Sequence, residues 1–211
     1  CISMQEVKDG FSIPIIDKDK CIECGLCIKA CHRLSLVVDY HTPRKTYACW
    51  TKNMTDRKRS SSGGAFSVLA RKILGEGGFV YGASMCKDLQ VRHKRIETEA
   101  DIILLQGSKY VQSYMGDTYK DVKAQLCDGR KVMFTGTPCQ VGGLLTYLHR
   151  YYDNLYTCDV VCHGVPSQKA FDIYINRIGL RGKCKHFSFR FTEGWGFQLS
   201  CQLEPPAKFK I

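Results

Sequence analysis

The sequence predicts an α/β fold in which a small cysteine-rich segment precedes a mixed α/β domain built from strand-loop-helix units. Residues 131–151 and 155–178 each consist of a short apolar strand, a loop with Gly and Pro, and an amphipathic helix. Two consecutive units of this kind imply parallel strands joined by right-handed crossovers. Four cysteines between positions 21 and 31 set the start of the chain apart. We therefore expect three parts, residues 1–40, 41–128 and 129–211.

The first part begins with two short alternating stretches, residues 2–7 and 11–16, on either side of Lys8-Asp9-Gly10. Alternation around a turn with Asp and Gly is typical of a β-hairpin. This hairpin leads directly into the cysteines.

The cysteines Cys21, Cys24, Cys27 and Cys31 follow one another at spacings of two, two and three residues. This is the ligand run of a bacterial 4Fe-4S ferredoxin, in which the fourth cysteine serves a second cluster. Zinc sites pair two such units across a longer gap, and disulfide frameworks do not place four cysteines so close together. The sequence thus predicts a small ferredoxin-like iron-sulfur segment, in a chain cut off from an upstream cysteine motif.

Two residues near the run modify this picture. Gly25 lets the backbone curl around a cluster without side-chain hindrance. His32 stands where a proline usually follows the last cysteine. We interpret His32 as a surface histidine, with iron coordination as the alternative.

The composition restricts compartment and partner. The chain has 211 residues and 13 cysteines, and the nine cysteines outside the run are scattered singly. That pattern suits thiols in a reducing cytoplasm, and no stretch is apolar for long enough to cross a bilayer. The formal charge is +11, but Lys and Arg are dispersed along the chain. We therefore expect a phosphate-bearing cofactor or an acidic redox partner, and no nucleic acid.

Residues 41–59 read as a polar linker, within which residues 47–50 form a candidate buried strand with Cys49 as a core thiol. Ser60, Ser61, Ser62, Gly63 and Gly64 then run into a helix at 65–74. Serines and glycines at a helix start present backbone N–H groups and the positive end of the helix dipole to a phosphate. An ordinary N-cap is the equal alternative.

The middle of the chain alternates strands and helices. We expect strands at 79–83 and 91–96, a short helix from Thr98 to Gly107, an extended stretch at 109–112 and a helix at 118–127 with Cys127 packed inward.

The two strand-loop-helix units follow. Their strands are predicted at 131–134 and 155–161, their helices at 140–151 and 168–178, and two final strands at 185–191 and 197–203. Ligands of parallel sheets bind beyond the carboxyl ends of the strands. The loops at 135–139 and 162–167 should therefore lie side by side at such an edge.

Four motifs occur in a fixed order, at residues 61–64 (SSGG), 107–113 (GSKYVQS), 136–140 (GTPCQ) and 162–167 (CHGVPS). Together with the cysteine run they resemble the beta-subunit family of coenzyme F-420 hydrogenases and dehydrogenases. The resemblance implies an iron-sulfur flavoprotein oxidoreductase that transfers electrons between 4Fe-4S clusters and a flavin, expected as FAD, and in some members on to coenzyme F-420. It also implies a redox partner protein or ferredoxin and a small-molecule electron acceptor.

The resemblance assigns flavin or coenzyme phosphate binding to two loops. Their residues are Ser61, Ser62, Gly63, Gly64, Gly136, Thr137 and Pro138. Cys139 and Cys162 could ligate a further cluster, face the flavin or simply pack. His163 could supply a hydrogen bond or proton to the flavin ring, or be a plain turn residue.

Three aromatic residues, Tyr110, Tyr114 and Trp195, are candidates to stack on the flavin or to fill the core. The sequence contains no paired carboxylates, serine triad or GxGxxG fingerprint of a hydrolase or dinucleotide dehydrogenase. A non-catalytic iron-sulfur electron-transfer module that docks to a redox partner is the alternative function. A zinc-stabilised nucleic-acid binder is a third.

Overall fold

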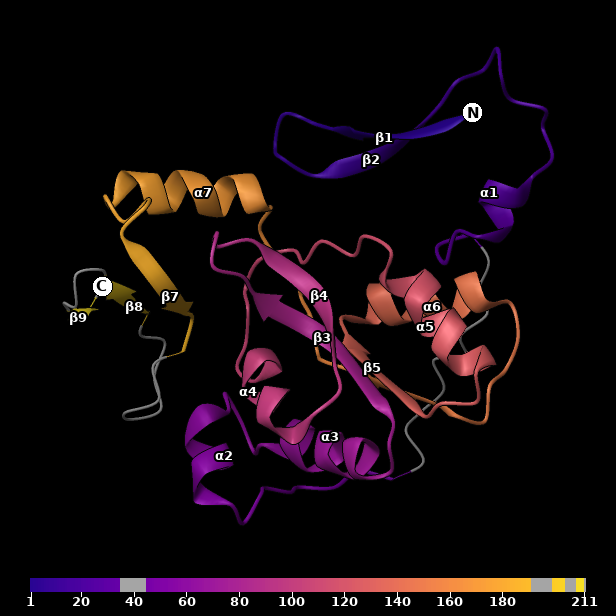
Figure 1. The fold of residues 1–211 in the computed structure, drawn as a ribbon. Coiled ribbons are helices and arrows are strands. Elements are labelled where there is room, and N and C mark those ends of the chain that lie inside the picture. Colours follow the sequence, from indigo (N-terminus) through magenta and orange to yellow (C-terminus); the bar gives the residue numbers. More distant parts are fainter. Residues whose placement is uncertain (35–44, 191–198, 204–207, 211) are drawn as a thin grey trace.

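A four-stranded sheet lies at the centre of the computed structural model, which describes residues 1–34, 45–190, 199–203 and 208–210. The strand order is β4-β3-β5-β6, and its first three strands are labelled in Figure 1. Strand β3 (Phe79–Met85) is antiparallel to β4 (Val91–Ile96) and parallel to β5 (Val132–Gly136), which in turn is parallel to β6 (Leu155–Asp159). The α/β fold class and the parallel pairing of the two units are confirmed.

Helices cover both faces of this sheet because its strands are apolar on both sides, as parallel strands usually are. On one face, Val80 and Met133 pack with α3 (Ala65–Gly75) and α4 (Ile102–Leu105). On the other face, Tyr81, Val132 and Phe134 pack with α5 (Thr118–Cys127) and α6 (Pro138–Leu148). Cys127 at the end of α5 is exposed, so the prediction that it packs inward is wrong. A 3-10 turn, η1 (Glu99–Asp101), precedes α4.

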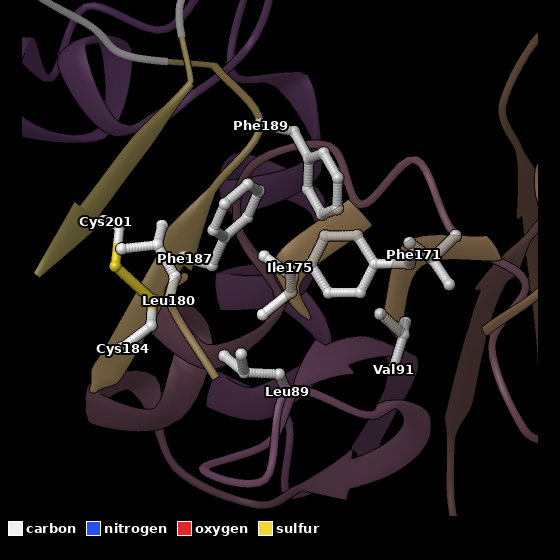
Figure 2. Close-up of a cluster of buried hydrophobic side chains, with 10 residues drawn as sticks. Leu89, Val91, Phe171, Ile175, Leu180, Cys184, Phe187, Phe189 and Cys201 are labelled. Carbon is white, nitrogen blue, oxygen red and sulfur yellow. A yellow bond between two sulfur atoms is a disulfide. The ribbon is translucent and has the colours of Figure 1, made fainter. Parts of the chain in front are cut away.

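A third hydrophobic core lies next to the N-terminal end of β4. There α7 packs on a small antiparallel sheet (Figure 2). Phe171, Phe187 and Phe189 meet pairwise, with ring centroids 5.0 to 5.4 Å apart, and Leu89 and Val91 join them to the central sheet. The elements are α7 (Gln168–Arg177), β7 (Cys184–Ser188), β8 (Ser200–Leu203) and β9 (Lys208–Lys210).

A disulfide joins Cys184 of β7 to Cys201 of β8. The prediction that all cysteines outside the run are single thiols is therefore wrong for this pair. Two cysteines 17 positions apart meet here because antiparallel pairing sets Phe187 opposite Cys201 and so brings the two strands together.

The N-terminal hairpin is confirmed as β1 (Ile2–Glu6) and β2 (Ser12–Ile16). It is followed by a loop and by the short helix α1 (Leu26–Lys29). Within the residues described here, no helix is long and apolar enough to cross a membrane.

The linker at 41–59 differs from expectation. Residues 47–50 form no strand, Trp50 is 70% exposed and the Cys49 thiol is exposed as well, so the predicted buried strand is wrong. Instead a helix, α2 (Met54–Arg59), follows, and the Asn53 side chain caps it by accepting the N–H groups of Thr55 and Asp56. This helix was missed because its residues are too polar to show apolar periodicity.

The helices of the two strand-loop-helix units start where their caps dictate. Helix α6 begins two residues before the predicted start because Pro138 occupies its first position and Thr137 with Gln140 forms a capping box. Helix α7 begins at Gln168, as predicted, after Ser167 as N-cap. Residues 35–44 and the turn around Trp195 lie outside the described part of the chain.

Candidate functional site

Residues 107–114, which we call the central segment, touch each of the other three motifs. The Ser108 N–H donates to Ser61 Oγ (2.9 Å), and the Gln112 N–H donates to the Pro166 carbonyl (3.0 Å). Gln140 Nε2 donates to Ser113 Oγ (2.8 Å). Motifs separated by up to a hundred residues are thus bonded to a single stretch of chain.

A chain of hydrogen bonds passes from the central segment into the sheet through His93. Its Nε2 lies 3.0 Å from the Thr135 carbonyl, which can only accept, so Nε2 carries the proton. Its Nδ1 therefore accepts from the Ser113 hydroxyl (2.8 Å). Gln140 donates to Ser113, as above, and accepts the Thr137 N–H on Oε1 (2.9 Å). The start of α6 is thereby fixed to β4 and β5.

Burial lowers the pKa of His93, and the nearby Lys109 cation lowers that pKa further. The ring is 8% exposed and stacks on Phe134 with centroids 5.3 Å apart. The neutral imidazole is therefore the form that the network needs. The sequence analysis missed His93, although its place two residues after Val91 in an alternating strand marks an inward-facing position.

Lys109 is the second titratable group of the central segment. Its Nζ donates to the Gln106 carbonyl (2.8 Å) and the Leu104 carbonyl (3.4 Å) at the end of α4. Burial lowers the pKa of Lys109 to about 7. A side chain with this pKa can give or take a proton near neutral pH.

The serine-glycine loop at 61–64 ends at Gly64, which has φ +78° and is the N-cap of α3. Arg57 and Arg190 donate to the carbonyls of Ser62 and Ser61, respectively. Two guanidinium groups thus lie beside the positive end of a helix, and positive charge of this kind attracts a phosphate.

The two glycines of this loop also have a purely structural reason. A Cβ on Gly63 would lie 2.4 Å from the Cys49 carbonyl oxygen, and one on Gly64 would lie 2.7 Å from Thr51 Cγ2. The Thr51 N–H in turn donates to the Gly63 carbonyl (2.8 Å). Close packing against residues 49–51 therefore requires glycine at both positions.

The buried carboxylate of Asp56 connects α2, which precedes the serine-glycine loop, to α3, which follows it. Asp56 of α2 is 4% exposed and accepts from Arg71 of α3 (2.7 Å) and from Gln106 (3.1 Å), which also donates to Ser67 (2.7 Å). The interaction with Asp56 is the main reason that the pKa of Arg71 is raised. This connection could not be read from the sequence because the partners of Asp56 come from two other elements, α3 and the end of α4.

The second predicted loop lies at the carboxyl edge of the sheet, as expected. The Val160 N–H donates to the Gly136 carbonyl (2.9 Å), so the loops after β5 and β6 are neighbours. Cys139 is exposed at the start of α6, with Sγ 3.0 Å from Thr137 Oγ1.

The loop after β6 carries the remaining candidates. Cys162 and His163 are both exposed, and the Cys162 sulfur accepts the Gly164 N–H (3.5 Å). Cys162, like Cys139, is thus not part of a packed core. In the ranges that the structure describes, no three His, Cys, Asp or Glu side chains are gathered to hold a metal ion.

Two of the aromatic candidates, Tyr110 and Tyr114, are on the surface of this region. Tyr110 is half-exposed and meets Phe189 edge-on, with centroids 5.8 Å apart. Tyr114 is 70% exposed and, with Tyr81 and His93, lines an open pocket of about 320 Å³ beside α5. Trp195, the third candidate, lies outside the described residues.

The cysteine run fits a 4Fe-4S cluster by its donor set. Gly25 has φ +70° with open space around it, and Cys27 lies on α1 just beyond it. All four cysteines are free and within eleven positions of one another. In the described structure no three of these sulfurs are gathered around a common point. Cys21, Cys24 and Cys27 would hold one cluster and Cys31 would serve a neighbouring one, and such a cluster takes up and releases one electron at a time.

Two stretches of the chain match known protein families. Residues 129–204 match the family that comprises the C terminus of the beta subunit of coenzyme F420 hydrogenase/dehydrogenase, and residues 12–33 match a 4Fe-4S binding domain. No curated protein matches the sequence.

A solved structure shares the fold. It is a chain of the xenon-derivatised F420-reducing [NiFe] hydrogenase complex from Methanosarcina barkeri, with a TM-score of 0.55 and 18% identity over 78% of the present chain. The match spans 60% of that chain's length. The two sequence matches and the shared fold confirm the resemblance predicted from the order of the motifs: residues 12–33 are similar to a 4Fe-4S binding domain, and residues 129–204 are similar to the C terminus of the coenzyme F420 hydrogenase/dehydrogenase beta subunit.

Proposed function

We propose that this chain is an iron-sulfur flavoprotein oxidoreductase subunit. In this proposal, Cys21, Cys24 and Cys27 bind one 4Fe-4S cluster, and Cys31 serves a neighbouring cluster. The α/β domain binds a flavin, expected as FAD. Electrons then pass to coenzyme F-420 or to another small-molecule acceptor, and a redox partner protein supplies or receives them.

The observation that carries the proposal is the convergence of the other three motifs on the central segment. Ser61, Pro166 and Gln140 are all bonded to residues 107–114. A set of motifs held together in this way is expected when they build one binding site. The basic side chains beside the 61–64 loop suit the phosphates of a flavin, for which the serines and helix dipole provide donors.

Within this site, we expect the protein's own side chains to fix the backbone of the binding loops and to supply or accept a proton. Thr137 and Gln140 fix the backbone of the second loop through their capping box. Lys109 belongs to the central segment, and its pKa of about 7 would allow it to gain a proton near neutral pH when a flavin bound beside that segment is reduced.

The test is anaerobic reconstitution followed by counts of iron, sulfide and flavin. We expect Cys24→Ser to lose most of the bound iron and Cys127→Ser, an exposed cysteine outside the run, to keep it. A wild-type chain that binds neither iron nor sulfide under these conditions would contradict the cluster assignment.

The phosphate loop is tested separately. Ser62→Asp places a negative charge on an exposed side chain of the loop, so flavin affinity should fall about tenfold or more. Asn176→Asp makes an equal charge change at an exposed position of α7 and should leave the flavin affinity unchanged. Equal affinities would show that this loop does not bind the phosphate.

A non-catalytic iron-sulfur electron-transfer module is favoured by one observation, the packing of Gly63 and Gly64 against residues 49–51. That packing explains both glycines without a cofactor. A reconstituted protein that contains iron and sulfide in full amount but no flavin would support this second function.

A further inference from the structure

We propose that Ser167 and Gly10 form a docking site that holds the cysteine-bearing segment on the α/β domain. Both would thus be positioning residues for electron transfer between the two parts. The docking is independent of any cofactor, whereas its role in electron transfer rests on the proposed function.

The hairpin β1–β2 meets the α/β domain through its turn. Every residue of both strands is exposed, whereas Val7, Gly10 and Phe11 at the turn are half-buried. Figure 1 shows this turn facing the beginning of α7. Because β2 leads to Cys21 through a four-residue connection, the turn also determines where the cysteines lie.

Two successive carbonyls of the turn are bound by the start of α7. The Ser167 hydroxyl donates to the Asp9 carbonyl and accepts the Ala170 N–H (3.2 Å). Lys169 Nζ donates to the Lys8 carbonyl (3.0 Å). Ser167 is 1% exposed, so its single proton is fully committed to the hairpin.

Gly10 makes this approach possible. Its φ of +82° is one that residues with a side chain rarely adopt. A Cβ at this position would lie 2.3 Å from Lys169 Cβ and 3.0 Å from Ser167 Oγ. Both the turn conformation and the contact with α7 therefore require glycine.

The docking site is also tied to the candidate flavin site. Pro166, next to Ser167, accepts the Gln112 N–H of the central segment. The same short stretch thus contacts the hairpin on one side and the central segment on the other. Ser167 is the last residue of the 162–167 motif, and the structure gives it a role in assembling the two parts rather than in holding a cofactor.

Amide hydrogen exchange of the full chain tests the docking. We expect Gly10→Ala to exchange about tenfold faster over residues 2–16, because strain and steric overlap both oppose docking. The control is Gly129→Ala, which has a similar φ of +75° and nothing within 4 Å of an added Cβ. Hairpin exchange in Gly10→Ala no faster than in this control would overturn the proposal.

Ser167→Asp separates docking from helix capping. A carboxylate can still accept the Ala170 N–H but has no proton to donate to Asp9. We expect faster exchange in the hairpin while α7 stays protected. Loss of protection in α7 with an unchanged hairpin would mean that Ser167 is only a cap.

The role in electron transfer is read on reconstituted protein with matched iron and flavin contents. Gly10→Ala should lower the rate at which the reduced cluster reduces the flavin, and Gly129→Ala should not. An opened hairpin with an unchanged rate would refute the positioning role. A wild-type chain that binds no flavin would refute the proposed function and that role with it, while the exchange result still decides the docking.

Discussion

His93 connects two of the four motifs, residues 107–113 and 136–140, to the central sheet. Its two ring nitrogens bond to Ser113 and to the Thr135 carbonyl, and Ser113 accepts from Gln140. A buried histidine whose two ring nitrogens are both hydrogen-bonded makes the network rigid. Removing it leaves buried partners without a hydrogen bond, which lowers the stability of the folded protein.

We expect His93→Gln to lower the free energy of unfolding by about 1–2 kcal/mol at neutral pH, because an amide replaces both bonds imperfectly. The pKa of His93 is lowered in the folded protein. As the pH falls below about 6.5, His93 is therefore protonated in the unfolded chain before it is protonated in the folded protein. The free energy of unfolding of the wild type therefore falls over this acidic pH range. In His93→Gln, which has no imidazole, this decrease is absent. Urea unfolding at about pH 7.5 and 5.5 should show a smaller difference between them at the lower pH. A difference that grows on acidification would contradict the assigned neutral imidazole.

Gly63 illustrates a residue whose replacement is limited by the backbone of a neighbour. Gly63→Ala should destabilise the protein by about 1–3 kcal/mol, because its Cβ would meet the Cys49 carbonyl and the backbone there must shift. Gly75→Ala is the control: it lies in α3 with nothing within 4 Å of a Cβ, and helix propensity predicts a gain of about 0.5–1 kcal/mol. Thermal unfolding of the two variants should move in opposite directions.

Among the secondary-structure elements, α2 is held to α3 and to the end of α4 by the hydrogen bonds that the Asp56 carboxylate accepts. We expect Asp56→Ala to cost about 2–4 kcal/mol, since Arg71 and Gln106 lose a buried acceptor, although Arg71 is partly exposed. The matched control is Asp88→Ala, whose ion pair with Arg92 is exposed on both sides and should cost less than about 1 kcal/mol. Denaturant unfolding of both variants measures the contrast. Similar losses would show that the buried pair is no stronger than a surface one.

Periodicity of apolar residues was sufficient to predict some helices and strands and failed to predict others. The strands β3, β4 and β5 and the helices α5 and α7 follow from alternation or amphipathic spacing, because each has one or two faces that must be buried. Helix α2 is stabilised by the Asn53 cap and the buried Asp56, and neither leaves an apolar pattern. The Cys184–Cys201 disulfide likewise depends on strand pairing that spacing along the chain does not reveal.

At the scale of the whole molecule, the charge of +11 should govern how a protein donor approaches. We expect reduction by an acidic electron-transfer protein to slow about tenfold between about 20 and 200 mM salt, because screening removes the attraction. Reduction mediated by an uncharged dye should stay constant over that range. Stopped-flow measurements compare the two, and a protein donor insensitive to salt would exclude electrostatic steering.

Four features could be read from the amino-acid sequence alone: the cysteine run, the hairpin before it, the parallel pairing of the two strand-loop-helix units and the order of the four motifs. These features rest on spacing and periodicity within short stretches, which the chain displays directly. Tertiary structure decided that residues 107–114 join the motifs, that His93 and Asp56 are their buried anchors, and that Gly10 meets Ser167 across more than 150 positions. Such contacts depend on which backbone groups approach each other in space, and a hydrogen bond between distant segments leaves no periodic signal in either one.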